Sequence, residues 1–276
     1  MAAPEGAHEG PHPLDAAIRL APVDGAHRRL RGATSEAYWN SVGPFGGVTA
    51  AVMLQAVMQQ PDRIGPPLSL TVNFPAAVQA GGFDIVVRLL RGGRTTQHWA
   101  LDLVQGEGDQ PMASALVACG VRRPVWSDRE ARPPALPPPP PDFGPRPGGF
   151  PVWLRHYREH VVRGGLFGPS HGSESAAWIV DHPPRPLDYP ALAAMCDAFF
   201  PRIFMRHAAP LPVATVSLNV YFHGDAAAMA AQGCQPLLSE ARGQVYEGGF
   251  FDQEGRMWGE GDRLLATTHQ VVWYRD

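Results

Sequence analysis

The chain of 276 residues is long enough for one large domain or two of ordinary size. Its residues are 45% hydrophobic and 18% charged, which is typical of a globular protein. The net charge is −3 and all 23 basic residues are arginine, so no basic field exists to attract nucleic acid or an anionic membrane. The N-terminus lacks the basic start and apolar core of a signal peptide, and no apolar run reaches the roughly 18 residues of a membrane span. We therefore expect a soluble, cytoplasmic protein.

The three cysteines, Cys119, Cys196 and Cys234, are odd in number, widely spaced and set among apolar neighbours. This pattern indicates neither a disulfide framework nor a zinc site. A reducing compartment fits it best, and we expect no metal.

The first half predicts one buried helix followed by four strands. The stretch GPFGGVTAAVMLQAVMQQP, from Gly43 to Pro61, starts with Gly and Pro, is apolar throughout and is closed by Pro61. Strand-like runs separated by Gly-rich turns follow it. They lie at Leu68 to Phe74, Phe83 to Leu90, Gln97 to Val104 and Met112 to Val121.

A Pro-rich segment divides the chain. From Arg132 to Pro151 it reads RPPALPPPPPDFGPRPGGFP, which has too few backbone donors for a helix or a sheet. We expect an extended tether there. It separates an N-terminal domain at residues 1–131, whose first ~15 residues are flexible, from a C-terminal domain at residues 152–276.

The second half repeats the order of the first. Asp188 is a helix N-cap, Pro190 lies in the first turn, and the predicted helix runs on through ALAAMCDAFFPRIF. The predicted strands are Ala214 to Phe222, Glu240 to Phe251 and Arg263 to Tyr274.

Two pairs of near-copies give the spacing of the repeat. SLTVNFP at Ser69 and SLNVYFH at Ser217 are 148 residues apart, whereas MASALV at Met112 and LATTHQ at Leu265 are 153 apart. The difference of five residues predicts a longer turn in the second copy, around WGEGD at residues 258–262.

A buried helix followed by a curled antiparallel sheet, present twice, resembles the double hot-dog fold. This is an α+β fold with two antiparallel sheets, each wrapped around a central helix. The runs PFGGVTAAVMLQA and SLTVNFPAAVQAGG in the first half, and MCDAFFPRI, ATVSLNVYFH and FFDQEGRMWGEGDRLLATTHQ in the second, are similar to those of the acyl-CoA thioesterase II family. The resemblance covers most of residues 35–275.

The resemblance implies a hydrolytic site in the second domain. The family activates a water molecule with an Asp, helped by a Thr and a Gln, and the matching positions are Asp197 in MCDAFF, Thr215 in PVATVS and Gln270 in TTHQVV. The run VSLN after Thr215 replaces a more acidic, His-containing run of the family. The resemblance also implies acyl-CoA as substrate, no cofactor, and a homodimer.

The residues themselves support Asp197 most strongly. Its predicted helix has almost no polar stripe, so the carboxylate is expected to be buried, and burial raises the pKa of a carboxyl toward the range of a general base. The alternative is a surface Asp. Only Arg202, five residues on, is a charged neighbour.

Thr215 and Gln270 are supported less by their surroundings. Strand alternation places Thr215 with Ser217 and Asn219, opposite an apolar face that includes Val216. A Thr there can simply be a good strand former. Gln270 shares a face with Ala266, Thr268 and Val272, and its amide can donate to and accept from a water; an ordinary edge-strand Gln is the alternative.

The first copy lacks all three groups. The position 148 residues before Thr215 is Pro67, the position 153 before Gln270 is Val117, and no Asp or Glu occurs between Pro44 and Pro61. We therefore expect one active site in each chain.

The expected reaction is hydrolysis of an acyl-CoA thioester. Backbone N–H groups at a helix N-terminus are candidate oxyanion donors, and Gly46 and Gly47 would let the substrate approach the chain closely. Tight helix packing is an equal alternative for these glycines. A non-catalytic acyl-CoA or lipid binder also stays open, and a hydratase or dehydratase is disfavoured because no D-x-N-P motif occurs.

Two other motifs are not interpreted as sites. GPSHG at residues 168–172 matches a nucleophile elbow but lacks the strand before it and the helix after it. HYREH at residues 156–160 matches an inverted zinc-protease pattern, but its segment could equally be a strand.

Overall fold

The computed structural model describes residues 10–106, 110–144, 151–166 and 172–276. In these residues the chain forms one antiparallel sheet of 13 strands together with four α-helices and four short 3-10 helices. The strands are β1 (Ala21–Val23), β2 (Ala26–Ala33), β3 (Pro67–Asn73), β4 (Gly82–Gly92), β5 (Thr96–Val104), β6 (Pro111–Gly120), β7 (Tyr157–Arg163), β8 (Ser175–Asp181), β9 (Val213–Phe222), β10 (Leu237–Arg242), β11 (Tyr246–Glu247), β12 (Phe250–Gly259) and β13 (Arg263–Tyr274). The helices are α1 (Pro13–Ala17), α2 (Gly46–Met58), α3 (Tyr189–Met195), α4 (Ala226–Gln232), η1 (Glu36–Tyr38), η2 (Val152–His156), η3 (Arg202–Met205) and η4 (Glu260–Asp262).

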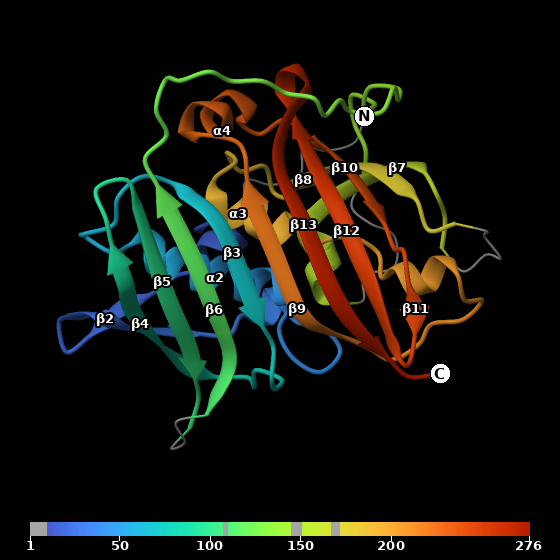
Figure 1. The fold of residues 1–276 in the computed structure, drawn as a ribbon. Coiled ribbons are helices and arrows are strands. Elements are labelled where there is room, and N and C mark those ends of the chain that lie inside the picture. Colours follow the sequence, from blue (N-terminus) through green and yellow to red (C-terminus); the bar gives the residue numbers. More distant parts are fainter. Residues whose placement is uncertain (1–9, 107–109, 145–150, 167–171) are drawn as a thin grey trace.

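The strand order of the sheet is symmetric about its centre. It runs β1-β2-β4-β5-β6-β3-β9-β13-β12-β10-β8-β7, with β11 paired to β12. Each strand of the first half has a counterpart at the mirrored place in the second, and β3 and β9 join the halves side by side (Figure 1). The expectation of two separate sheets is therefore wrong in this detail, because backbone hydrogen bonds continue across the β3–β9 seam.

The near-copies that mark the repeat pair with each other. The register of β3 and β9 runs from Ser69 opposite Tyr221 to Asn73 opposite Ser217, with Thr71 opposite Asn219 in the middle. Thr71 and Asn219 are 148 residues apart, and the Thr71 hydroxyl donates a hydrogen bond of 2.7 Å to Oδ1 of Asn219. A local two-fold axis thus passes between these two residues, at the seam of the two halves.

The extra residues of the second copy lie in one connection. Residues 74–81 join β3 to β4, whereas residues 223–236 join β9 to β10 and contain α4. The prediction that the WGEGD segment holds the extra residues is wrong, since Trp258 and Gly259 end β12 and the η4 turn that follows leads directly into β13. The insertion therefore lies at the end of the seam strand β9.

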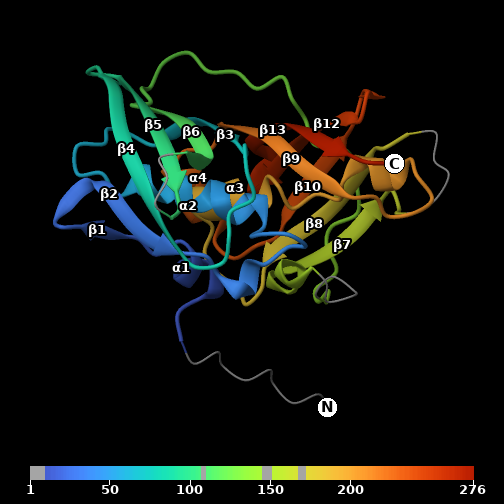
Figure 2. The same ribbon diagram turned by 90° about the horizontal axis from the view of Figure 1, so that it is seen from below.

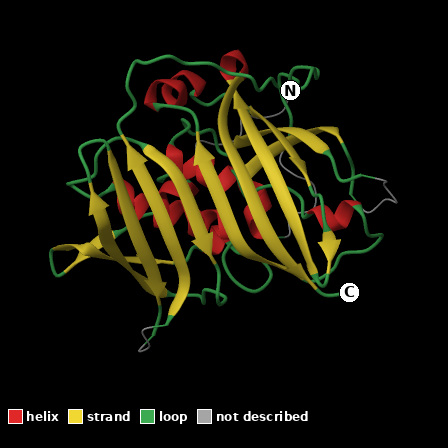
Figure 3. Ribbon diagram, viewed as in Figure 1, coloured by secondary structure: helices red, strands yellow, loops and turns green. Residues whose placement is uncertain are grey.

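The helices α2 and α3 pack against each other on one face of the sheet, inside its curve (Figures 2 and 3). The prediction of a buried helix between Gly43 and Pro61 is confirmed, because α2 lies on β3, β4, β5 and β6 and ten of its 13 residues are buried. One core cluster includes side chains of both halves, such as Met53 and Leu192. Within the described residues, no helix is long and apolar enough to cross a membrane.

The second-half helix is shorter than its sequence predicts. Asp188 is its N-cap, as expected, and accepts a hydrogen bond of 2.9 Å from the Ala191 N–H. However, α3 ends at Met195, and the chain resumes a helical turn only as η3, after Pro201. Pro201 lacks an N–H and disfavours a helical conformation of the residue before it, so a continuous helix through this segment is excluded.

The predicted strand Glu240 to Phe251 is also wrong. This segment contains the end of β10, a hairpin and the start of β12. The hairpin includes Gly248 and Gly249, whose φ angles of 60° and 81° interrupt a strand. The sequence pattern does not predict β12 beyond Phe251, nor β1, β2, β7 and β8.

The described part of the Pro-rich segment, which ends at residue 144, packs against the second half, and residues 145–150 lie outside the described residues. Residues 121–144 form no helix or strand, and Leu136 packs on a cluster that includes Trp258. The Trp178 indole N–H donates a hydrogen bond of 3.0 Å to the carbonyl of Pro137. The tether therefore lies against the second half, while the division into domains at residues 131 and 152 stays a prediction.

Substituting Leu70 at the seam should destabilise both halves together. Leu70 of β3 is fully buried, and Leu70→Ala is expected to lower the free energy of unfolding by about 2–5 kcal/mol. Urea unfolding followed by tryptophan fluorescence should show a single transition, because the core is continuous.

Leu116→Ala is the matched control. Leu116 is 54% exposed on the neighbouring strand β6, and its loss should change the stability by less than about 0.5 kcal/mol. Equal effects of the two variants, or separate unfolding of the two halves, would contradict the shared core.

Candidate active site

Asp197 lies in a tight turn directly after α3, not within the helix as the sequence predicts. The Asp197 N–H donates to the carbonyl of Ala194 at 3.1 Å, and the Ala198 N–H donates to that of Met195 at 3.0 Å. These bonds span three residues, so the last helical turn tightens and ends there. The Asp197 side chain is 9% exposed, which confirms that it is buried.

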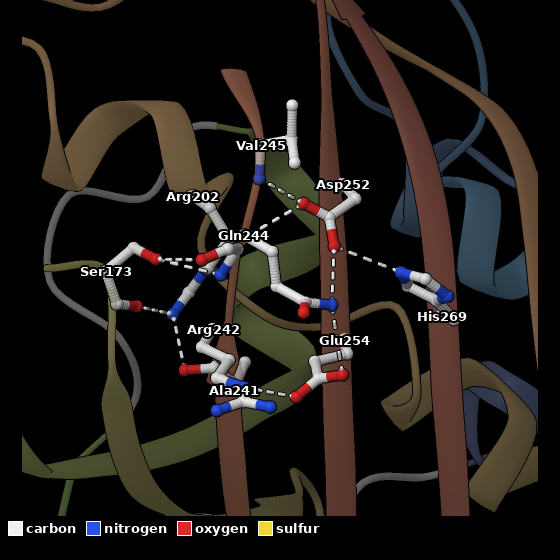
Figure 4. Close-up of polar contacts among 10 residues, drawn as sticks. Ser173, Arg202, Ala241, Arg242, Gln244, Val245, Asp252, Glu254 and His269 are labelled. Atoms are coloured by element: carbon white, nitrogen blue, oxygen red, sulfur yellow. Dashed lines mark hydrogen bonds and ion pairs between the residues drawn. The ribbon is translucent and has the colours of Figure 1, made fainter.

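Arg202 fixes the segment that follows Asp197. Its guanidinium is fully buried and donates to the carbonyl of Phe200 and to the carbonyls of Ser173 and Ala241, at 3.1 and 3.3 Å for the last two (Figure 4). Ala241 belongs to β10, so Arg202 ties the Asp197 turn to the sheet. These contacts turn the guanidinium toward backbone oxygens, and it is not among the groups that shift the Asp197 pKa.

The N-terminus of α2 meets the Asp197 carboxylate. A Cβ at Gly46 would lie 2.8 Å from Oδ2 of Asp197, and the N–H of Gly47 is a hydrogen-bond donor to the carboxylate. The partial positive charge at a helix N-terminus also favours an anion there. The sequence-predicted residues Asp197, Gly46 and Gly47 are therefore brought together, from opposite halves of the chain.

Gly47 also lets the two helices cross closely. A Cβ at Gly47 would lie 2.5 Å from the carbonyl oxygen of Ala194 in α3. The alternative role of tight packing is thus correct for Gly47, and it coexists with the contact to Asp197.

Gln270 faces the same carboxylate from the sheet. It is 2% exposed on the inner face of β13, and its amide donates to the carbonyl of Cys196 at 3.4 Å and acts as a donor to Asp197. Burial raises the pKa of Asp197 to about 7, although the hydrogen bonds from Gln270 and Gly47 both lower it.

A β-bulge places Thr215 on the inner face of the sheet. Ser217 pairs with Val271 and Thr215 with Val272, so Val216 is an extra residue without a partner on β13. The face predicted for Thr215 and Val216 is therefore wrong: Val216 is 40% exposed, and Thr215 lies opposite the buried Val272. Within the described residues, no hydrogen bond joins Thr215 to Asp197 or Gln270.

The bulge recurs in the first half, where β3 skips a residue between Pro67 and Ser69. Pro67 is thus the structural counterpart of Thr215. Likewise Leu70 pairs with Val117 as Leu218 pairs with Gln270, so Val117 is the counterpart of Gln270. Both equivalences that the repeat predicts are confirmed.

Behind the site, a polar network covers the outer face of the sheet (Figure 4). Asp252 accepts hydrogen bonds from the N–H groups of Gln244 and Val245 at 2.7 and 2.8 Å and lies 3.1 Å from Nε2 of His269. Despite partial burial, these donors lower the pKa of Asp252. His269 is exposed and Asp252 already accepts several hydrogen bonds, so this pair is suited to stabilising the β12–β13 hairpin.

The two motifs set aside in the sequence do not enter the site. HYREH spans the last residue of η2 and the first four of β7, and is not on the long helix that its zinc pattern requires. Most of GPSHG lies outside the described residues. The described residues contain no group of three or more metal-ligating side chains, and all three cysteines are free.

Asp181, at the end of β8, is a second buried carboxyl. It is 1% exposed, neither of its oxygens has a hydrogen-bond partner among the described residues, and burial raises its pKa to about 7. Unlike Asp197, it has no backbone or amide donor to hold it in one orientation. We therefore place the candidate site at Asp197.

Two polar residues of the inner wall are missed by the sequence analysis. Gln253 of β12 and Thr268 of β13 are both 3% exposed, and Oε1 of Gln253 and the Thr268 hydroxyl lack hydrogen-bond partners in the described part of the chain. A comparison of the two copies could have revealed Gln253 and Thr268, because their counterparts in the first half are the apolar Trp99 and Ala115.

The buried Asp197 should make the protein less stable at higher pH. Its folded-state pKa of about 7 is above the ordinary 3.8. The contribution of Asp197 to stability is therefore complete below about pH 4 and is lost as the pH rises through 7. The unfolding free energy measured in urea should therefore fall between about pH 5 and 8, and Asp197→Asn should flatten this fall, leaving the part due to Asp181.

Asp252→Asn is the control, because the pKa of Asp252 is lowered and the residue stays ionised in this range. It should reduce stability without changing the slope. A slope in Asp197→Asn equal to that of the wild type would contradict the raised pKa of Asp197.

Comparisons with known proteins agree with this architecture. The family model described as acyl-CoA thioesterase N-terminal domain matches residues 35–120, and the acyl-CoA thioesterase C-terminal domain matches residues 129–274. A search of proteins with curated function found no match.

The chain is also similar to solved structures. A conserved protein of unknown function with a hot-dog fold from Alicyclobacillus acidocaldarius is 40% identical, with a TM-score of 0.90, over 97% of this chain and 99% of the other. An acyl-CoA thioesterase II from Mycobacterium marinum is 21% identical, with a TM-score of 0.74, over 95% and 96% of the two chains, and shows the fold alone. With both family domains matched in order, the chain belongs to the acyl-CoA thioesterase family and has its hot-dog fold.

Proposed function

We propose that the protein hydrolyses acyl-CoA thioesters, with Asp197 as the general base and with Thr215 and Gln270 holding the attacking water. The observation that carries the proposal is the buried Asp197 carboxylate, which has a pKa of about 7 and lies between the Gln270 amide and the N-terminus of α2. A base with a pKa near the working pH is ionised in a large share of the molecules and still accepts a proton readily.

The proposed step conserves atoms and charge. One O–H bond of the water breaks and its proton goes to Asp197, while the water oxygen bonds to the thioester carbon and the carbonyl electrons move to the carbonyl oxygen. The tetrahedral intermediate then collapses, the C–S bond breaks, and CoA leaves as a thiolate, which needs no acid. The thiolate then takes up the proton that Asp197 holds, so the products are a carboxylic acid and CoA and the carboxylate is regenerated.

The developing oxyanion requires donors, and the start of α2 is the best candidate. The Gly47 N–H is directed to Asp197, so the Gly46 N–H at the first helical position is the candidate donor to the oxyanion. Because the first-half counterparts of Thr215 and Gln270 are Pro67 and Val117, the proposal has one site per chain. The homodimer and the cytoplasmic location stay predictions from the sequence.

Thiol release from acyl-CoAs of short to long chain length tests the function. The wild type should hydrolyse part of the panel, and kcat/KM should rise with pH and level off above about 7, because the base must be ionised. Asp197→Asn should lower kcat by at least about 100-fold, whereas Asp252→Asn on the outer face should retain activity.

Binding of acyl-CoA without thiol release by the wild type would instead support the non-catalytic binder. Addition of water to an enoyl-CoA without cleavage would support the hydratase.

Gly46→Ala should separate activity from stability. The new Cβ would lie 2.8 Å from Oδ2 of Asp197 and displace the carboxylate, while alanine favours the helix. We expect kcat to fall by about tenfold or more with a Tm no lower than that of the wild type. Gly144→Ala, where the Cβ meets nothing within 4 Å, is the control. Full activity of Gly46→Ala would exclude a close approach of α2 to the reacting groups.

A further inference from the structure

Gln253 and Gln270 form a pair of buried amides in the wall of the site. They lie directly opposite each other on β12 and β13, and they are 3% and 2% exposed. Side chains in this relation have Cβ atoms about 5 Å apart. Gln253 is therefore the cross-strand neighbour of the residue whose amide is a donor to Asp197.

The carbonyl oxygen of Gln253 is a buried acceptor without a donor. Within the described residues no hydrogen bond reaches Oε1 of Gln253. Gln270, in contrast, already donates a hydrogen bond of 3.4 Å to the Cys196 carbonyl. An unsatisfied acceptor in a dry wall indicates a partner that comes from outside the chain, such as a water or a substrate.

The first half shows that the fold does not need an amide at this place. There the equivalent pair is Trp99 of β5 and Val117 of β6, which oppose each other as Gln253 and Gln270 do. Trp99 is fully buried and Val117 is 1% exposed, so this pair contains no amide and no buried acceptor from a side chain, although the Trp99 indole N–H has no partner among the described residues. The pair of amides occurs in the half that holds Asp197.

We propose that Oε1 of Gln253 accepts a hydrogen bond from the second O–H group of the water that Asp197 deprotonates. A water has two O–H groups, and if Asp197 takes the proton of one, the other needs an acceptor in a site closed to bulk water. Two acceptors on the two hydrogens turn a lone pair of the oxygen away from both, toward the thioester carbon. Gln253 would then touch the reacting water and act as a catalytic residue. This inference rests on the proposed hydrolysis.

The Thr268 hydroxyl provides an internal control. It is also buried without a partner, but it lies opposite Gly255, where the Phe199 ring packs so closely that a Cβ would lie 2.7 Å from it. This hydroxyl is thus one residue pair further along the wall, beneath an aromatic side chain.

The kinetic test compares Gln253→Met, which keeps the length but removes the acceptor, with Thr268→Val. For Gln253→Met we expect kcat to fall by about tenfold to fiftyfold, which is the order of magnitude for one lost hydrogen bond to the reacting water. KM should stay within about twofold of the wild-type value. The midpoint of the acid limb of the pH profile should stay within about 0.3 pH unit of that of the wild type. Thr268→Val should stay within twofold of the wild-type rate. Equal losses in the two variants, or a shifted midpoint in Gln253→Met, would overturn the proposal in favour of a structural role or an action through Asp197.

Gln253→Glu adds a rescue. It keeps an acceptor but places a second negative charge beside Asp197, so the pH midpoint should rise while the rate above that midpoint exceeds that of Gln253→Met. A rate no higher than that of Gln253→Met at every pH would count against the acceptor role.

A high-resolution crystal structure of the wild type separates this inference from the proposed function. We expect an ordered water bonded to both Asp197 and Oε1 of Gln253, and its absence in Gln253→Met. If no acyl-CoA is hydrolysed but this water is present, the proposed function fails and the placement of the water by Gln253 stands. If thioesters are hydrolysed but Oε1 of Gln253 bonds no water, the inference fails and the function stands.

Discussion

The site depends on the close crossing of α2 over the end of α3. Only glycine at position 47 permits it, because any Cβ would meet the carbonyl of Ala194. The crossing brings the N-terminus of a first-half helix against a second-half carboxylate, and Gly46 leaves room for that carboxylate. Neither half has both parts, so Asp197 meets a helix N-terminus only because the two halves pack together.

The two halves of the duplicated fold differ in the side chains that line the inner face of the sheet. The inner wall of the first half is apolar where that of the second is polar. The pairs of counterparts, read from the strand registers, are Pro67 and Thr215, Trp99 and Gln253, Ala115 and Thr268, and Val117 and Gln270. The first half therefore supplies packing and a helix N-terminus, and the second half supplies groups that can exchange hydrogen bonds with a substrate or a water.

Features set by local chemistry and by the repeat were predictable from the sequence. The helix α2, the Asp188 cap and the spacing of the seam strands follow from apolar runs, capping residues and near-copies. The face of Thr215 was not predictable, because the bulge at Val216 shifts the alternation by one residue and depends on pairing with β13. A break in the helix before Arg202 was predictable from Pro201, whereas the end of α3 already at Met195 was not, because the run that follows it is strongly apolar. Gln253 could have been found only by comparing every position of the two copies.

The polar groups of the site also set a cost that the surrounding structure must offset. A buried acceptor without a partner costs about 1–3 kcal/mol, and burying the Asp197 charge costs more. Stabilising contacts lie next to the site. The fully buried Arg202 holds the turn after Asp197 through several hydrogen bonds to backbone oxygens. A guanidinium that bonds to carbonyls rather than to Asp197 leaves the carboxylate without a fixed cation, so its pKa stays high enough for it to take up a proton. Had Arg202 paired with Asp197, the turn would be as well anchored, but the pKa of the carboxyl would be lowered and its carboxylate would be a weaker proton acceptor.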